Sequence, residues 1–265
     1  MKVEKWCLLL LVIFSGFAQA MDGVFDRSSE VAKYIEQFNG DLSREQMIDV
    51  AKSVYVSGIG DEKLTHAIGE RLLKDIRDLN DYRTASQYGS WMVKALGSTG
   101  NDVARDYIIS VCKKTAVQSI VSECKQQLKE LAWERRKNEI MSSRKNFSEG
   151  DDMRVAQMLN LLKSNDLTYQ MDAAYRMSWD KILDDRLMQE IAEQLQLFVN
   201  KHGVAMHKRE YALISNYCKL LGYSHNDKYK PLLLAVTKTE APEILVRAQA
   251  KKAIKRIDDK EANSE

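Results

Sequence analysis

The chain repeats itself, and this constrains its fold more than any other feature. Residues after about 155 restate residues after about 31, at an offset of about 124 positions. Val31-Ala32 returns as Val155-Ala156, and Gln46-Met47 returns as Gln170-Met171. The repeated apolar positions include Leu64, Ile68 and Leu72 in the first copy and Leu187, Ile191 and Leu195 in the second. Their spacing of four predicts amphipathic helices, and a recurring helical unit must stack on its neighbours to bury its apolar face.

Each copy predicts six helices joined by short turns, which makes three helical hairpins. The helix starts are marked by capping residues, such as Ser43-Arg44-Glu45-Gln46, which has the form of a capping box. Within each half a shorter period of about 40 appears, because Gly60-Asp61 aligns with Gly100-Asn101. The chain has only two prolines among 265 residues, which favours an all-helical fold.

The repeat and the composition together predict the organisation of the chain. We expect a signal peptide over residues 1–20 and a first three-hairpin half over residues 21–140. A connection over residues 141–150 is expected to lead to a second three-hairpin half over residues 151–257, followed by a charged tail over residues 258–265.

The first 20 residues have the composition of a signal peptide. Lys2 and Lys5 precede an apolar run from Trp6 to Phe14, and Ala18-Gln19-Ala20 has the small-x-small form of a cleavage site. The run is too short to span a membrane, and no later segment is apolar enough over that length, so no transmembrane segment is expected. We predict cleavage after Ala20 and a periplasmic or secreted protein.

The last hairpin resembles a HEAT repeat. Pro231 lies early in its first helix and is followed by Leu233-Leu234. The second helix carries Val246-Arg247-Ala248 and a closing aliphatic pair, Ala253-Ile254. The other five hairpins keep only the apolar skeleton. The resemblance implies an α-solenoid used for protein binding and transfers no catalytic residue. The predicted fold class is therefore all-α, a right-handed α-α superhelix of about six stacked hairpins, HEAT/armadillo-like and internally duplicated.

Three cysteines follow the predicted cleavage point. Cys112 and Cys124 flank a predicted turn near Thr115, and Cys218 lies in the second half. The expected stagger of the two antiparallel helices places the first pair beyond the roughly 7 Å Cα separation that a disulfide allows. We therefore predict buried thiols.

No constellation of catalytic or metal-binding residues is found in the sequence. His202 and His207 are five residues apart, which does not place two ligands on one helical face. Acidic pairs such as Asp61-Glu62 fall at helix starts, where they are expected to act as caps. We predict no enzyme activity, no cofactor and no metal.

Two groups of residues are candidates for contact with a partner. Arg247, Lys251 and Lys255 are spaced by four and share one face of the last helix, where a solvated outer face is the alternative. The second group combines an aromatic ring with neighbouring guanidinium groups, a composition typical of interface anchors, and consists of Trp133, Arg135 and Arg136. Packing against the connection between the halves is the alternative for Trp133.

The predicted function is that of an exported, non-catalytic, HEAT-like scaffold for protein–protein interactions in the bacterial envelope. The expected partner is a protein or peptide, acidic if the basic stripe is used, with peptidoglycan or anionic lipid as further contacts. Charge is nearly balanced, with 40 Lys and Arg against 38 Asp and Glu, which excludes bulk nucleic-acid binding. The alternatives are a peptidoglycan-associated enzyme or its accessory subunit, and a secreted factor that acts on another cell.

Overall fold

The computed structural model describes residues 23–76, 82–200, 207–238 and 244–262, so the predicted signal peptide lies outside the described residues. The helices of the first half are α1 (Ser28–Asn39), α2 (Arg44–Ser57), α3 (Glu62–Asp75), α4 (Tyr82–Ser98), α5 (Asp102–Lys114) and α6 (Gln118–Ser142). Those of the second half are α7 (Met153–Leu162), α8 (Leu167–Asp180), α9 (Asp185–Asn200), α10 (Lys208–Tyr223), the 3-10 turn η2 (Asp227–Tyr229), α11 (Lys230–Lys238) and α12 (Ile244–Ala262).

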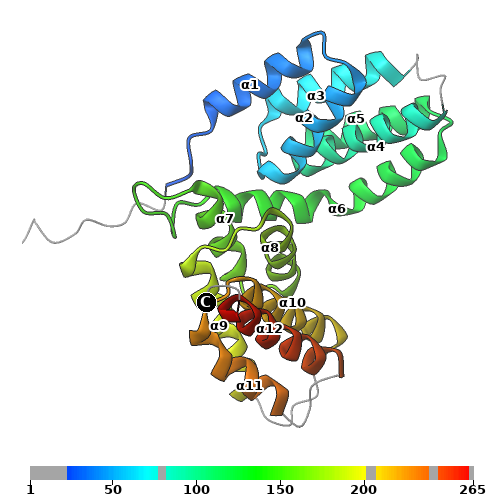
Figure 1. The fold of residues 1–265 in the computed structure, drawn as a ribbon. Coiled ribbons are helices and arrows are strands. Elements are labelled where there is room, and N and C mark those ends of the chain that lie inside the picture. Colours follow the sequence, from blue (N-terminus) through cyan, green and yellow to red (C-terminus); the bar gives the residue numbers. More distant parts are fainter. Residues whose placement is uncertain (1–22, 77–81, 201–206, 239–243, 263–265) are drawn as a thin grey trace, which may run out of the picture.

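The described residues form an all-α fold of stacked hairpins, as predicted (Figure 1). In the first half α1, α3 and α5 pack side by side in one layer, and α2, α4 and α6 form the layer behind it. The second half repeats this order with α7, α9 and α11 against α8, α10 and α12. In Figure 1 the long helix α6 runs between the first half above and the second half below.

Local hydrogen bonds explain where the helices begin. The capping box predicted at Ser43 is present, because its hydroxyl accepts from the Gln46 N–H while the Gln46 side chain accepts from the Ser43 N–H. Asp and Asn side chains also accept from backbone N–H groups at the starts of α3, α5, α8 and η2, at Asp61, Asn101, Asp166 and Asn226. Such caps recur in both halves, so the helix starts follow the repeat.

The buried side chains form two hydrophobic cores. One runs from Phe38 to Leu131 and the other from Met141 to Ile257. Helix α6 contributes to both, because Leu131 belongs to the first core and Met141 to the second. The long helix is therefore the element through which the two halves share their packing.

Two segments predicted to be irregular are helical. Helix α6 continues through Ser142, into the predicted connection, because the buried Asn138 amide donates to the carbonyl oxygens of Ser98 and Thr99 at 2.8 and 3.1 Å. Helix α12 continues through Ala262, into the predicted tail, where Asp258 pairs with Lys230 at 2.9 Å. Tertiary partners hold both polar segments in the helix.

The three cysteines in the described residues are free thiols. Cys124 and Cys218 are buried, as predicted, whereas Cys112 is half-buried. Burial raises the pKa of the Cys218 thiol to about 12. The pKa of Cys124 is also raised, first by burial and then by a hydrogen bond with the Cys112 thiol. The Cys112 and Cys124 thiols are thus close to each other without being joined in a disulfide.

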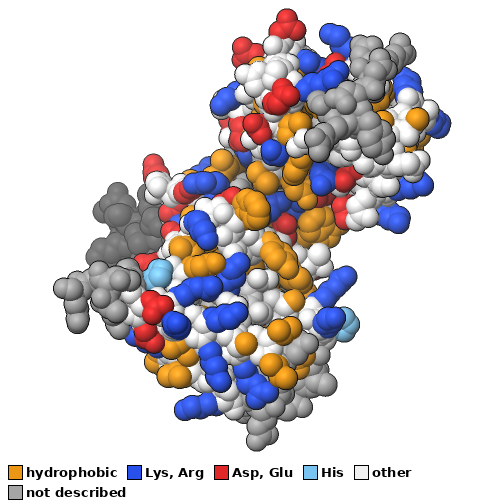
Figure 2. Space-filling view, turned by 45° about the vertical axis from the view of Figure 1, so that its right-hand side comes forward, with side chains coloured by type: hydrophobic (Ala, Val, Ile, Leu, Met, Phe, Trp, Pro, Cys, Tyr) orange, Lys and Arg blue, Asp and Glu red, His pale blue; other side chains and the backbone are white. Residues whose placement is uncertain are grey.

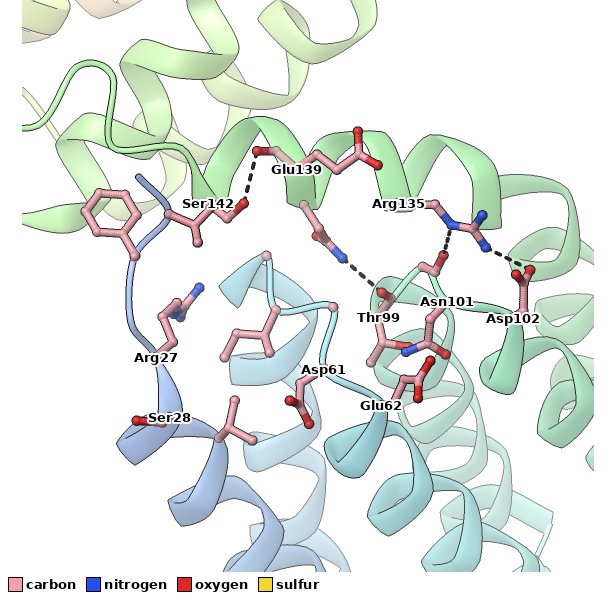
Figure 3. Close-up of a pocket in the computed structure, with 18 residues that line it drawn as sticks. Arg27, Ser28, Asp61, Glu62, Thr99, Asn101, Asp102, Arg135, Glu139 and Ser142 are labelled. Carbon is pink, nitrogen blue, oxygen red and sulfur yellow. Dashed lines mark hydrogen bonds and ion pairs between the residues drawn. The ribbon is translucent and has the colours of Figure 1, made fainter. Parts of the chain in front are cut away.

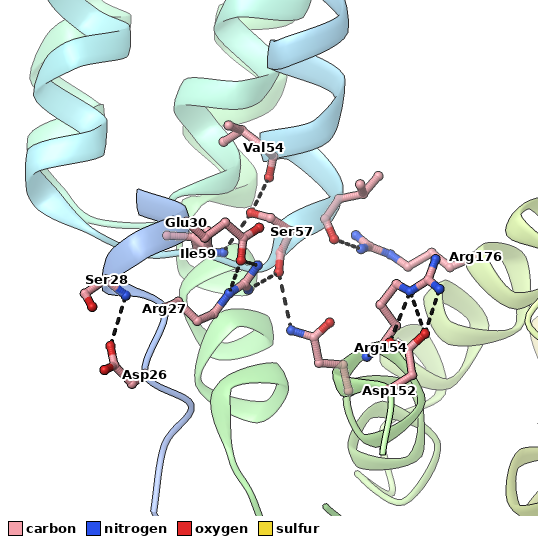
Figure 4. Close-up of polar contacts among 12 residues, drawn as sticks. Asp26, Arg27, Ser28, Glu30, Val54, Ser57, Ile59, Asp152, Arg154 and Arg176 are labelled. Carbon is pink, nitrogen blue, oxygen red and sulfur yellow. Dashed lines mark hydrogen bonds and ion pairs between the residues drawn. The ribbon is translucent and has the colours of Figure 1, made fainter. Parts of the chain in front are cut away.

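Polar contacts join the end of α2 to the second half (Figure 4). The Ser57 carbonyl oxygen accepts from Arg27 at 2.5 Å and from Gln157, on α7, at 3.5 Å. The Val56 carbonyl oxygen accepts from Arg176, on α8, at 2.7 Å. Carbonyl groups at a helix end have no partner within the helix, so these side chains satisfy them and fix the two halves together.

The close approach of α4 and α6 predicts a strong effect of one substitution. Gly100 has φ +69°, and a Cβ there would lie 2.4 Å from the backbone nitrogen of Arg135. Gly150 has φ +89° and nothing within 4 Å of its Cβ position. Gly150→Ala should lose about 1 kcal/mol of unfolding free energy from backbone strain alone, and Gly100→Ala about 3 kcal/mol or more. Urea unfolding measures both, and equal losses would contradict the close approach.

Candidate functional site

A cleft of about 680 Å³ lies between the N-terminal ends of α1, α3 and α5 and one side of α6. Figure 3 shows α6 crossing above these helix starts, with Arg135 and Glu139 on α6 and Ser28, Glu62 and Asp102 on the three helices. The stacking of hairpins places three helix starts side by side. The cleft is therefore a direct product of the repeat.

The lining of the cleft carries more negative than positive charge. Its charged side chains are the four carboxylates Asp61, Glu62, Asp102 and Glu139 and the two guanidinium groups Arg27 and Arg135. Both guanidinium groups are already paired, Arg135 with Asp102 at 2.7 Å and Arg27 with Glu30 at 2.6 Å. Glu139 pairs with Arg136 at 2.8 Å. Within the part of the chain that the structure describes, Asp61 and Glu62 form no ion pair.

Hydrogen bonds fix the walls of the cleft. Asp61 accepts from the Leu64 N–H at 2.9 Å, which leaves its second carboxylate oxygen available. The Asn101 amide donates to the Thr65 hydroxyl at 2.6 Å, and Arg135 donates to the Gly100 carbonyl oxygen at 3.0 Å. Since these bonds join α3, α5 and α6, the charged groups keep their relative positions.

An extended segment of the chain forms one rim of the cleft. Phe25 donates its N–H to the Ser142 carbonyl oxygen at 2.9 Å, and Arg144 donates to the Gly23 carbonyl oxygen at 2.8 Å. This antiparallel bridge places Val24, which is 68% exposed, at the cleft. The end of α6 can therefore pair with extended backbone.

A second polar cluster lies on α6 at the junction with the second half. Glu134 and Lys137 form an ion pair in which both side chains are 1% exposed. The Lys137 ammonium group lies 4.4 Å from the Trp133 ring centroid and 5.7 Å from that of Tyr55. Burial raises the pKa of Glu134 and lowers that of Lys137, while their mutual attraction opposes both shifts.

This buried pair was missed by the sequence reasoning, although a signal was present. Leu131, Glu134, Asn138 and Met141 follow one another at spacings of three, four and three, which is the spacing of one helix face. All four are buried. From this stretch the sequence analysis singled out only Trp133, Arg135 and Arg136, as candidates for contact with a partner.

The structure separates the residues predicted to contact a partner. Trp133 is half-buried and stacks on Tyr169 of α8 at 5.5 Å between ring centroids. Arg135 lines the cleft, and Arg136 is exposed outside its lining. The basic stripe lies on α12, in the other half, with Lys251 and Lys255 exposed and Arg247 half-buried. Of the six residues only Arg135 reaches the cleft, and the contact roles stay predictions.

No group of three or more His, Cys, Asp or Glu residues in the described part of the chain lies close enough to hold a metal ion. None of the described helices is both long and apolar enough to cross a membrane.

Comparison with known proteins returned little. No family model matches the chain, and no curated protein matches it. A solved structure that is similar is human deoxyhypusine hydroxylase in complex with glycerol, with 14% identity over 86% of this chain and 84% of that chain and a TM-score of 0.31. A similarity of this size transfers neither a site nor an activity.

The fold and the cleft define an all-α, solenoid-like protein with a cleft beside α6 whose lining carries four carboxylates and two guanidinium groups. The predicted function needs a correction. The sequence suggested a non-catalytic interaction scaffold of the bacterial envelope, whereas the solved structure found by comparison is that of an enzyme. We do not propose a non-catalytic scaffold for this chain.

The buried pair on α6 generates a prediction for stability. Lys137→Met leaves Glu134 without its counter-charge in the interior and should lose about 3–5 kcal/mol of unfolding free energy. Arg136→Met, which opens the exposed pair with Glu139, should lose less than about 1 kcal/mol. Replacing both members by apolar residues, Glu134→Leu with Lys137→Met, should recover most of the loss. Urea unfolding at pH 7 measures all three variants.

The stability of the Lys137→Met variant has an expected pH dependence. Burial already holds the pKa of Glu134 above its usual value, so the folded state binds a proton more tightly than the unfolded chain. The contribution of Glu134 to the free energy of unfolding therefore falls as the pH rises through its folded-state pKa. The loss of unfolding free energy caused by Lys137→Met should accordingly become smaller on acidification. If Lys137→Met loses the same unfolding free energy as Arg136→Met at every pH, the burial of the Glu134–Lys137 pair is contradicted.

Proposed function

We propose that this protein is an exported α-solenoid that binds a positively charged group of a peptide or small ligand in the cleft beside α6. The observation that supports the proposal is the charge of the cleft. Asp61 and Glu62 form no ion pair with the described residues, while both arginines of the lining are already paired.

The chemistry of the groups favours a cation as the ligand. Ionised carboxylates only accept hydrogen bonds, whereas an ammonium or guanidinium group only donates them. The positive end of the α3 dipole stabilises negative charge on Asp61 and Glu62. A ligand cation would gain charge-assisted hydrogen bonds without displacing an existing ion pair.

The rim of the cleft supports a peptide as the carrier of that cation. Residues 23–25 already lie there in extended form and exchange backbone hydrogen bonds with the end of α6. A bound peptide in a similar conformation could place a lysine or arginine side chain between the helix starts. The exposed side chain of Val24 would contact its apolar portion.

Two sequence predictions belong to the proposal. Export rests on the tripartite order of residues 1–20, and the HEAT-type repeat rests on Pro231 and Arg247 in the last hairpin. The acidic partner expected for Arg247, Lys251 and Lys255 concerns α12 and is a separate contact from the cleft.

A matched pair of substitutions tests the cleft. The tripeptide Gly-Lys-Gly should bind to the full chain, and Glu62→Gln should weaken this binding about 3- to 10-fold because one charge-assisted contact is lost. Glu45→Gln removes the same charge from the first turn of α2, outside the cleft lining, and should leave binding unchanged. NMR chemical-shift titration gives the dissociation constants and the residues affected.

Two outcomes would contradict the proposed function. One is the absence of binding by Gly-Lys-Gly at millimolar concentration, or equal binding by Gly-Glu-Gly. The other is a loss of affinity in Glu45→Gln that matches the loss in Glu62→Gln.

A further inference from the structure

Three cations in the second half surround one aromatic ring. The Lys181 ammonium nitrogen lies 4.1 Å from the Tyr223 ring centroid, and that of Lys219 lies 5.6 Å from it. The guanidinium carbon of Arg256 lies 4.6 Å from the same centroid. These residues come from the ends of α8 and α10 and from the late part of α12. The stacked hairpins therefore bring three like charges to one place.

No carboxylate in the described residues pairs with any of the three cations. One nitrogen of the Arg256 guanidinium group, Nη1, is buried and has no hydrogen-bond partner among the described residues. Like charges gathered within 4.1–5.6 Å of one ring centroid repel one another, and contact with a single aromatic ring offsets only part of that repulsion. The three cations therefore have no counter-charge among the described residues.

The first half contains a compensated counterpart. Lys52 and Lys94 lie 5.7 and 4.8 Å from the Trp91 ring centroid. There Lys52 pairs with Asp49 at 3.0 Å, and Lys94 pairs with Glu123 at 3.7 Å. A cluster of cations on an aromatic ring is therefore balanced by carboxylates in one half and unbalanced in the other.

The backbone around the cluster is unusual as well. Lys181 and His225 have φ of 56° and 50°, and they are two of the three non-glycine residues with positive φ in the described residues. His225 also forms a hydrogen bond through Nδ1 with the Arg256 carbonyl oxygen at 3.0 Å, which ties the end of α10 to α12. Strained backbone that is held by tertiary contacts is a common property of binding sites.

We propose that Lys181, Lys219 and Arg256 bind a phosphate group beside Tyr223. A phosphate monoester carries close to two negative charges at neutral pH and three strong acceptor oxygens, which matches three cations around one ring better than a single carboxylate does. Figure 2 shows Lys and Arg side chains gathered over the lower part of the molecule, which is the second half. This site is distinct from the cleft beside α6, which lies in the first half and has the opposite charge.

The phosphate has two possible sources, free phosphate or the headgroup of an anionic lipid. Trp179, two residues before Lys181, is 88% exposed, and Tyr175 one turn earlier is 54% exposed. Aromatic rings of this kind are favoured where an apolar phase meets water, so they suit a lipid headgroup. The chemistry at the three cations is the same for both sources.

The experiment has one arm for each source. In the first, sodium phosphate is compared with sodium chloride at equal ionic strength, and phosphate should raise the unfolding temperature of the full chain. In the second, vesicles of phosphatidylglycerol in phosphatidylcholine should sediment the chain, whereas pure phosphatidylcholine vesicles should not. Lys181→Gln, Lys219→Gln and Arg256→Gln should each weaken binding about tenfold in whichever arm is positive.

Lys113→Gln is the matched control, because it removes one exposed charge from the last turn of α5, away from Tyr223 and from the basic stripe of α12. It should change binding less than about twofold. A positive result with vesicles alone identifies a lipid headgroup, and a positive result with phosphate identifies a site for the free ion. Failure of both arms overturns the proposal, as does an equal loss of binding in Lys113→Gln. A lower unfolding temperature of Lys181→Gln without any phosphate effect would show that the cations only stabilise the fold.

Discussion

The ion pair between Glu134 and Lys137 is the interaction on which the junction of the two halves depends. Both side chains are almost completely buried on α6, and Trp133 covers the pair while it stacks on Tyr169 of the second half. Removing a charge from water is unfavourable unless the partner and the surrounding groups compensate it. The pair therefore requires α2, α6 and α8 to stay together, and the cleft on the other side of α6 inherits that rigidity.

The duplication gives the two halves one skeleton and two different surfaces. Shared apolar positions and caps specify the same order of helices, so both halves gather helix ends at comparable places. The charges placed there differ. The first half has a cleft with unpaired carboxylates, and it neutralises the cations around Trp91, whereas the second half leaves the cations around Tyr223 without a counter-charge. Specific binding is expected at positions where the two halves carry different residues, because the positions that they share are used for packing.

Much of the fold could be predicted from the sequence because its signals are local. The Ser43 capping box and the apolar stripe of Leu64, Ile68 and Leu72 act within one or two turns. The errors concern residues whose partners are distant in sequence. The boundary predicted at residue 140 falls inside α6, which is held to the first half by hydrogen bonds from the Asn138 amide to the carbonyl oxygens of Ser98 and Thr99. Of the residues that line the candidate site, Arg135 alone was predicted as a contact residue, whereas Asp61 and Glu62 were expected only to act as helix caps.

The sequence by itself determined that the chain is helical, that its hairpins occur in two copies and where most of the helices begin, because caps and apolar spacing act over a few residues. Only the tertiary structure decided which charges are buried, which are paired and which remain available. Those properties depend on the distance between groups far apart in the chain and on how much water is excluded between them. For that reason Glu134 and Lys137 became interior residues, while Glu62 and Lys181 remained available for a ligand.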